Sequence, residues 1–248
     1  MKFIILGIIQ GLTEFFPVSS SGHLMIAEKL LGFSQDQLFW VLVCHMGTLL
    51  AMVIFFFKDI LGLFRKIGLL GHILIVTVVT AVIALACKDF FESLFVSTRA
   101  LSVSFFITGV ILLLAGRFQS GKRSINSIDI RDSLFLGFMQ AVAIVPAISR
   151  SGTTISALLF RGIDKEAAFK FSFLAGIPAI AGAFLLEIKD AGKIVDCDWT
   201  GLTLAFVASF LSGLFALAVL RSVLNKAKFH WFGYYCIVLA VLTAVFLK

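Results

Sequence analysis

The sequence predicts an all-α integral membrane protein, with six transmembrane helices and two re-entrant helical hairpins arranged as an inverted repeat. Three observations carry this prediction. Of the 248 residues, 60% are hydrophobic and only 14% are charged, whereas roughly 25% are charged in soluble domains. Six apolar stretches approach the length of about 20 residues that a membrane-spanning helix needs. Two short polar segments, 130 positions apart, interrupt the apolar sequence and share several residues.

The composition excludes a soluble protein with a large core, because the mean hydropathy is +1.07. The net charge of +7 could indicate a nucleic-acid partner in a soluble protein. Here the Lys and Arg residues cluster in short loops between apolar stretches, so we expect them to set membrane orientation, with no nucleic acid bound. The four cysteines stand singly without metal-ligand spacing, so we expect them to be buried apolar residues.

Six stretches are long enough to be candidate spans. They cover residues 39–57, 69–87, 100–116, 171–187, 200–220 and 230–247. Residues 3–16, 22–31, 133–146 and 152–161 are apolar but too short to cross. Each pair of short stretches is joined by one polar segment, either 17–23 or 146–152. Irregular backbone at membrane depth is tolerated where protein or a wet cavity surrounds it, so each polar segment is predicted to be the tip of a re-entrant hairpin.

The two halves of the chain match when the sequence is shifted by 130 positions. The shift aligns seven pairs without a gap: Gly7/Gly137, Gln10/Gln140, Ser19/Ser149, Ser21/Ser151, Gly22/Gly152, Ala27/Ala157 and Gly32/Gly162. We therefore predict one membrane domain over residues 1–248, with repeat 1 at about 1–117 and repeat 2 at about 131–248. Three spans separate the hairpins, so the second enters from the opposite face and the repeat is inverted.

Loop charge predicts the orientation. With Arg150 set aside, one face carries 13 basic residues and the other carries 7. The richer face is expected to be cytoplasmic, with both termini outside. Its residues are Lys58, Arg65, Lys66, Arg117, Lys122, Arg123, Arg131, Arg161, Lys165, Lys170, Arg221, Lys226 and Lys228; the other face holds Lys2, Lys29, Lys88, Arg99, Lys189, Lys193 and Lys248.

The first polar segment and the helix before it carry candidate catalytic residues. Glu14 lies in an apolar stretch, where a carboxylate is costly and indicates function. Gln10 lies four residues earlier on the same helix face. Ser19, Ser20 and Ser21 precede an apolar helix, and a helix N-terminus with nearby hydroxyls can bind an anion. His23 adds a group that exchanges a proton near neutral pH.

The second polar segment repeats this anion-binding pattern and adds an arginine. Arg150 needs a negative partner within the membrane, either Glu14 or a phosphate, and its planar fork suits phosphate. The predicted catalytic residues are thus Glu14, Ser20, His23 and Arg150. The residues predicted to bind substrate are Gln10, Ser19, Ser21, Ser149, Ser151, Gly152, Thr153 and Thr154.

The other histidines are expected to have structural roles. His45 lies inside a predicted span, His72 lies near the start of one, and His230 stands beside Trp231. We expect all three to be packing or interfacial residues. Tyr234 and Tyr235 are expected to anchor the last span at the membrane surface.

Residues 10–23, QGLTEFFPVSSSGH, closely resemble the first signature of the undecaprenyl-diphosphate phosphatase family, the integral membrane enzymes associated with bacitracin resistance. Residues 146–154, PAISRSGTT, resemble its second signature, and the order and spacing fit over essentially the whole chain. Two positions are notable. The family has Glu or Gln where Gln10 stands, and it usually has Gly where Ala147 stands.

The resemblance implies a hydrolase that converts undecaprenyl diphosphate to the monophosphate and inorganic phosphate, recycling the carrier lipid of cell-envelope synthesis. It also implies a plasma-membrane enzyme whose site opens to the outer face, helped by a divalent cation, Mg or Ca, for which Glu14 is the candidate ligand. Glu14, Ser20, His23, Ser149, Arg150 and Thr154 match functional positions of the family. The sequence leaves the oligomeric state open, and a homo-oligomer is compatible with it.

A transporter or flippase of a phosphorylated polyprenyl lipid is the alternative. Inverted repeats with broken helices are typical of secondary transporters, and Arg150 with the hydroxyls would bind phosphate in either protein. Glu14 and His23 favour the enzyme, because a carboxylate beside phosphate helps a hydrolase but not a simple anion binder. Within the enzyme, the sequence leaves the nucleophile open among serine, histidine and water.

Overall fold

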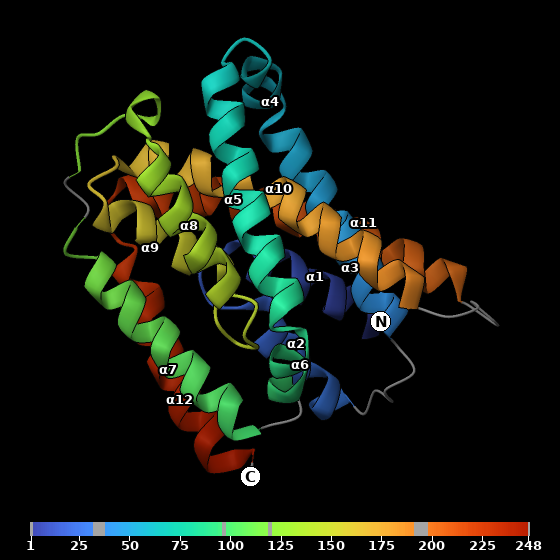
Figure 1. Ribbon diagram of the computed structural model, residues 1–248. Coiled ribbons are helices and arrows are strands. Elements are labelled where there is room, and N and C mark those ends of the chain that lie inside the picture. Colours follow the sequence, from blue (N-terminus) through green and yellow to red (C-terminus); the bar gives the residue numbers. More distant parts are fainter. Residues whose placement is uncertain (1, 32–37, 96–97, 119–120, 191–197, 248) are drawn as a thin grey trace.

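The structure, a computed structural model, describes residues 2–31, 38–95, 98–118, 121–190 and 198–247 (Figure 1). Within these ranges the chain forms α-helices, one short 3-10 helix and no strand, which confirms the predicted all-α class. The helices are α1 (Lys2–Phe15), α2 (Ser20–Leu31), α3 (Leu38–Phe55), α4 (Phe57–Leu63), α5 (Ile67–Ala86), α6 (Lys88–Phe95), α7 (Thr98–Ala115), η2 (Ile125–Ser127), α8 (Ile130–Val142), α9 (Arg150–Phe160), α10 (Lys165–Asp190), α11 (Trp199–Asn225) and α12 (His230–Phe246).

Two pairs of short helices, α1 with α2 and α8 with α9, correspond to the predicted hairpin arms. They have 14, 12, 13 and 11 residues. At a rise of 1.5 Å per residue the longest extends about 21 Å, which is less than the roughly 30 Å of a bilayer's hydrocarbon core. Residues 16–19 and 143–149 join the arms, so the helix breaks fall in or beside the two polar segments.

The first arm of each pair packs against a long helix from the other half of the chain. α1 lies along α11, and α8 lies along α5 (Figure 1). Glycines allow both approaches: a Cβ on Gly7 would overlap the carbonyl oxygen of Ala205, and one on Gly137 would come within 3.0 Å of that of Val76. α7 and α12 also pack against each other. The two halves are therefore interlocked rather than placed end to end.

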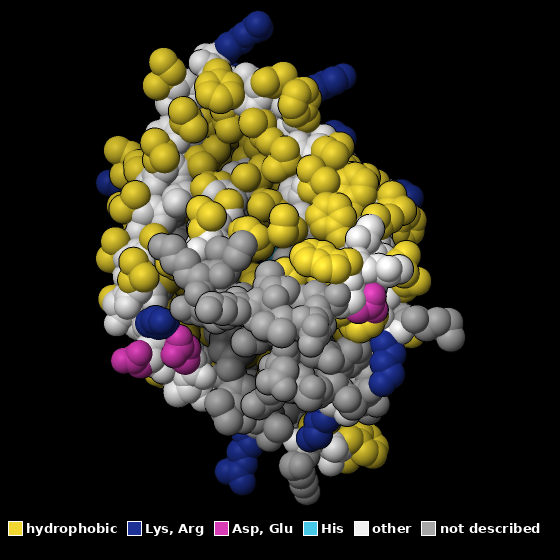
Figure 2. Space-filling view, turned by 90° about the vertical axis from the view of Figure 1, so that its right-hand side faces the viewer, with side chains coloured by type: hydrophobic (Ala, Val, Ile, Leu, Met, Phe, Trp, Pro, Cys, Tyr) yellow, Lys and Arg dark blue, Asp and Glu magenta, His cyan; other side chains and the backbone are white. Residues whose placement is uncertain are grey.

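The helices present an apolar surface to their surroundings. Three of the described helices, α5, α10 and α11, are each long and apolar enough to cross a membrane, and the number rises to five if α3–α4 and α6–α7 each form one bent span. Helix α12 is apolar but shorter. Large side chains such as Leu74, Val78, Val82 and Leu85 of α5 are exposed. Figure 2 shows apolar side chains covering much of one face, with Lys and Arg side chains at its upper edge. This is a membrane protein.

The cysteines follow the prediction with one exception. Cys44 and Cys236 are buried, as expected. The expectation is wrong for Cys87, which is exposed because it lies at the junction where α5 ends and α6 begins. Cys197 lies outside the described residues.

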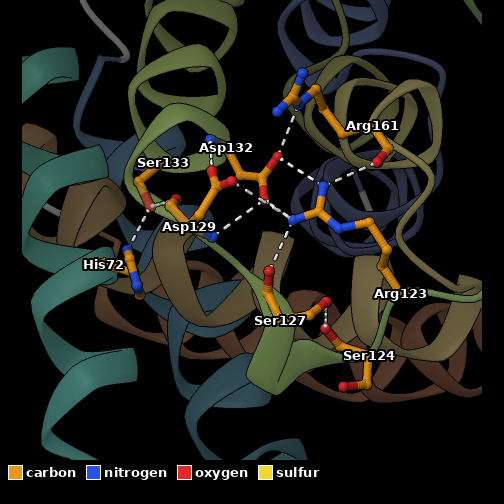
Figure 3. Close-up of polar contacts among 8 residues, drawn as sticks. All are labelled: His72, Arg123, Ser124, Ser127, Asp129, Asp132, Ser133 and Arg161. Carbon is orange, nitrogen blue, oxygen red and sulfur yellow. Dashed lines mark hydrogen bonds and ion pairs between the residues drawn. The ribbon is translucent and has the colours of Figure 1, made fainter.

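A cluster of charged side chains closes the base of the α8–α9 pair (Figure 3). The Asp132 side chain is fully buried. It accepts hydrogen bonds from Arg123 Nη2 at 2.6 Å and from Arg161 Nε at 2.7 Å. Burial by itself would raise the pKa of Asp132, but these two hydrogen bonds and that from the Asp129 amide hold the pKa below its ordinary value. The cluster joins the loop before α8 to the first turn of α8 and to the end of α9.

His72 contributes to the same region from α5. Its Nδ1 lies 2.8 Å from Ser133 Oγ, and Ser133 Oγ also donates a hydrogen bond to the Asp129 carbonyl (Figure 3). His72 therefore contributes a hydrogen bond that links α5 to α8.

Candidate active site

The two polar segments fold in the same way. Ser19 Oγ accepts a hydrogen bond from the Gly22 amide at 3.4 Å, and Ser149 Oγ accepts one from the Gly152 amide at 3.1 Å. Each serine therefore caps the helix that follows it. A second hydroxyl accompanies each cap, because Ser21 Oγ lies 3.2 Å from Ser19 Oγ and Ser151 Oγ lies 3.3 Å from Ser149 Oγ. The residues that match in sequence thus make matching hydrogen bonds.

The two turns also touch each other. The Ala147 amide donates to Ser21 Oγ at 3.2 Å, and Ser151 Oγ donates to the Phe16 carbonyl at 3.3 Å. These contacts connect positions 126 and 135 residues apart in the chain. The two polar segments are therefore in direct contact.

Both turns contain a residue with left-handed backbone conformation. Ser19 has φ 69° and Ala147 has φ 62°. An L-residue in this region carries a strain of roughly 1 kcal/mol that glycine does not. Ala147 therefore stands where the backbone favours glycine. Thr108 of α7 holds this turn, since its Oγ1 donates to the Ala147 carbonyl and accepts from the Ser149 amide, both at 3.2 Å.

Glu14 lies where the two tips meet and is the centre of a polar cluster. Its side chain is 8% exposed. Arg150 Nη2 donates to Oε1 at 2.7 Å, while Ser20 Oγ and Gln10 Nε2 donate to Oε2 at 2.6 and 3.1 Å. Ser20 and Arg150 are equivalent positions under the shift of 130, and they bind different oxygens of the same carboxylate. The expected proximity of Glu14 and Arg150 is confirmed.

A small cavity of about 80 Å³ opens beside this cluster. Its wall carries one carboxylate, one guanidinium and several hydroxyls. It includes Ser20 and Arg150, the first residues of α2 and α9, and a helix N-terminus favours an anion. The residues that line it are Thr13, Glu14, Ser19, Ser20, Ser21, Ala143, Ile148, Ser149 and Arg150.

Several residues predicted for the site lie beside this cavity and do not form its wall. Thr154 Oγ1 lies 2.6 Å from Ser172 Oγ and donates to the Arg150 carbonyl at 2.7 Å. Thr153 is buried, and its hydroxyl has no hydrogen-bond partner among the described residues. Ser151 and Gly152 serve the turn itself through the contacts given above. Of these residues, Thr154 contacts the backbone of Arg150.

His23 also faces away from the cavity. Its Nδ1 lies 2.7 Å from the Ser19 carbonyl, so this nitrogen donates and Nε2 can accept from the Tyr235 hydroxyl, 2.7 Å away. The ring lies parallel to Tyr235 with its edge toward Phe105. The side-chain direction, which sequence spacing does not define, separates His23 from the carboxylate of Glu14.

His45 lies near that carboxylate instead. Its Nε2 is 3.9 Å from Glu14 Oε2, and its Nδ1 is 2.8 Å from the Val41 carbonyl. The expectation of a packing residue therefore overlooked a site neighbour. The signal was present in the sequence, because an ionisable residue inside a span indicates function by default.

Gly176 of α10 is a second residue that the sequence reading missed. A Cβ at this position would overlap Arg150 Nη1. The absence of a side chain therefore creates the space in which the guanidinium lies. Nothing in the local sequence distinguishes Gly176 from other glycines of the spans.

The donor atoms suit a hard divalent cation only in part. Glu14 supplies a carboxylate, and the buried Gln10 Oε1 has no hydrogen-bond partner among the described residues. Oxygen donors of this kind are those that Mg²⁺ and Ca²⁺ prefer. No group of three or more His, Cys, Asp or Glu side chains is gathered for a metal in the described part of the chain. A cation here would depend on hydroxyl, amide and substrate oxygens.

Comparisons with known proteins cover nearly the whole chain. The family model described as bacitracin resistance protein BacA matches residues 3–242. A protein named undecaprenyl-diphosphatase from Carboxydothermus hydrogenoformans is 45% identical over 244 residues, covering 96% of this chain and 94% of the relative. Proteins of the same name from Alkaliphilus metalliredigens and Methanobrevibacter smithii are 41% and 37% identical, covering 94% and 98% of this chain and 94% and 95% of those relatives.

Proposed function

This chain belongs to the BacA family of bacitracin resistance proteins, and from that membership we propose that it hydrolyses undecaprenyl diphosphate to undecaprenyl phosphate and inorganic phosphate. The observation that carries the proposal is the cluster of Glu14, Ser20 and Arg150 where the two tips meet. A phosphatase needs a cation for the phosphates and a base for the nucleophile, and this cavity has both.

Arg150 is proposed to hold the diphosphate. Its guanidinium is paired with Glu14. A diphosphate offers more negative oxygens in a bidentate geometry, so Arg150 exchanges its partner when substrate enters. The Ser149 side chain and the N-termini of α2 and α9 add neutral donors that stabilise the charge developing on the phosphoryl oxygens.

Ser20 and Glu14 are proposed to form the nucleophile and base pair. The Ser20 hydroxyl donates to Glu14 Oε2 at 2.6 Å, which is within reach for proton transfer. As Ser20 Oγ bonds to the terminal phosphorus, its proton passes to Glu14, and the bond from phosphorus to the bridging oxygen breaks. Undecaprenyl phosphate leaves. Water then cleaves the phosphoserine, which releases inorganic phosphate and restores the serine.

The other residues predicted for the site are proposed to support this geometry. His23 fixes the first turn through the Ser19 carbonyl. Gln10 orients the Glu14 carboxylate, and Thr154 holds the backbone at Arg150. A divalent cation, Mg or Ca, would be held by Glu14 and Gln10 Oε1 and would neutralise charge on the phosphates.

The proposed architecture is six spans and two re-entrant hairpins in an inverted repeat, with the halves at about 1–117 and 131–248. It is supported by the matching hydrogen bonds of the two turns. It is also supported by the packing of α1 against α11 and of α8 against α5, because each of these pairs joins the two halves of the chain. The spans are α3, α5, α7, α10, α11 and α12. The excess of basic residues on one side supports a plasma-membrane enzyme whose catalytic cavity opens to the outer face.

Phosphate release by the purified, detergent-solubilised protein tests the proposal. With undecaprenyl diphosphate we expect stoichiometric inorganic phosphate and undecaprenyl phosphate, and a chelator arm tests the cation separately. Absence of phosphate release with every divalent ion tried would reject the hydrolase, and movement of the lipid across vesicles without hydrolysis would favour a flippase.

A further inference from the structure

A second polar pocket lies away from the catalytic cavity, at the bend between α3 and α5. Helix α3 turns by 69° into α4 after Phe56, whose buried ring packs against Phe169 and Phe173 of α10. Between α4, the start of α5, η2 and α10 there is a cavity of about 170 Å³. It is lined by Lys58, Asp59, Gly62, Leu63, Lys66, Leu69, Ile125, Lys170 and Leu174.

The pocket carries an excess of positive charge. Three lysines and one aspartate line it. Lys170 is matched by Asp59 at 3.2 Å and Glu166 at 3.8 Å. Among the described residues, no carboxylate lies within 4.0 Å of Lys58 or Lys66, and Lys66 contacts only the neutral Asn126 side chain, at 3.5 Å. Two ammonium groups at the rim therefore have no carboxylate partner within 4.0 Å in the part of the chain that the structure describes.

The surroundings of the pocket indicate a membrane surface. Phe57, Leu61, Phe64 and Ile67 are 56%, 52%, 73% and 79% exposed, so α4 and the following turn present an apolar face outward. Basic residues alternate with these apolar ones, as in segments that lie in the headgroup region of a bilayer. Figure 2 shows Lys and Arg side chains at the upper edge of the molecule above the apolar surface, at the end where Figure 1 places α4.

We infer that this lysine pocket binds the phosphate headgroup of an anionic phospholipid. Lys58 and Lys66 supply the charge for the phosphate, and Leu63, Leu69 and Leu174 provide apolar walls for the adjoining part of the lipid. A free anion would also be attracted by the two lysines, but it would make no favourable contact with the leucines or with the membrane. Basic pockets between helices at a membrane surface have this recognition chemistry.

Native mass spectrometry of the full-length protein in detergent, titrated with phosphatidylglycerol or phosphatidylcholine, tests the inference. The parent protein should bind phosphatidylglycerol more tightly. Since each lysine near the surface contributes about 1 kcal/mol, the double variant Lys58→Gln/Lys66→Gln should weaken that binding roughly tenfold or more. The catalytic cavity is unchanged in both proteins, so the difference reports the lysine pocket.

Two matched variants make the result decisive. Lys226→Gln/Lys228→Gln removes the same charge from exposed lysines of the α11–α12 turn and should leave the affinity unchanged. Lys58→Arg/Lys66→Arg keeps the charge and should retain binding. Parent-like affinity in the glutamine variant of the pocket, or equal loss in the α11–α12 control, would overturn the site. Displacement of the lipid by millimolar inorganic phosphate would overturn the lipid assignment in favour of a free-anion site.

Discussion

Glu14 and Arg150 lie 136 residues apart in the chain, yet Arg150 Nη2 lies 2.7 Å from Glu14 Oε1. The pair joins the tips of two helix pairs whose residues match in sequence and in hydrogen bonding. Because the side chains are only 8% and 17% exposed, each depends on the other to compensate its desolvation. The catalytic cavity therefore forms where the two halves of the chain meet.

Substitution of Gly176 tests whether turnover depends on the position of the Arg150 guanidinium. Gly176→Ala puts a methyl group where Arg150 Nη1 lies, and the flexible guanidinium must move. We expect kcat/KM for phosphate release to fall at least tenfold, with the unfolding temperature changed by only a few degrees. Gly182→Ala on the same helix adds a methyl group to open space and should be neutral. Parent-like activity in Gly176→Ala would show that the guanidinium position is not critical.

His45 was expected to be a packing residue, but it lies beside Glu14, so its substitution shows whether it contributes to turnover. Because its Nε2 is 3.9 Å from Glu14 Oε2, we expect His45→Ala to lower kcat by roughly tenfold. His45→Gln keeps a polar group of similar reach and should recover part of the loss. His72→Ala, which disturbs Ser133 outside the cavity, serves as the control and should leave kcat unchanged. Equal kcat in all three variants would return His45 to a packing role.

Much of the site was predictable from the sequence, for physical reasons that particular residues make clear. Repetition of Ser19 at Ser149 and of Gly22 at Gly152 predicted that the two polar segments would be equivalent. The cost of a buried charge predicted that Arg150 would need a negative partner, for which Glu14 was one of two candidates. The direction of His23 toward Tyr235 and the approach of His45 to Glu14 were not predictable. Both depend on how each helix is rotated about its axis, which tertiary packing decides.

Ala147 tests strain in the second turn. At φ 62°, Ala147→Gly should relieve roughly 1 kcal/mol of strain, offset in part by the greater freedom of glycine in the unfolded chain. We expect an unchanged or slightly higher unfolding temperature and retained activity. Ala141→Gly, which removes a buried methyl group from the last turn of α8, should destabilise by about 1 kcal/mol. A clear loss of stability in Ala147→Gly would contradict the strain reading.

Asp132 tests the charged cluster at the base of α8 and α9. Its folded-state pKa lies below the unfolded value, so the cluster stabilises the protein above an unfolded pKa of about 3.9 and loses this contribution as pH falls through the folded pKa. Asp132→Asn should cost about 2 kcal/mol near pH 7 and should remove that part of the acid dependence. Thermal unfolding measured across pH checks both expectations.

The exposed Lys88–Glu92 pair provides the control for Asp132. Its partners are 61% and 64% exposed, so Glu92→Gln should change stability by less than about 1 kcal/mol. Equal effects of Asp132→Asn and Glu92→Gln would mean that the buried cluster contributes no more than a surface ion pair.

Phosphate release by folded Glu14→Gln protein tests the central claim most directly. Glutamine keeps the shape of Glu14 and the contact with Ser20 but cannot accept the proton, so we expect turnover to fall at least a hundredfold while undecaprenyl diphosphate still binds. Ser20→Ala and Arg150→Lys should also lose most of their activity, the latter because it lacks the bidentate fork. If folded Glu14→Gln and Ser20→Ala proteins both hydrolyse undecaprenyl diphosphate at the parent rate, the catalytic assignment is wrong.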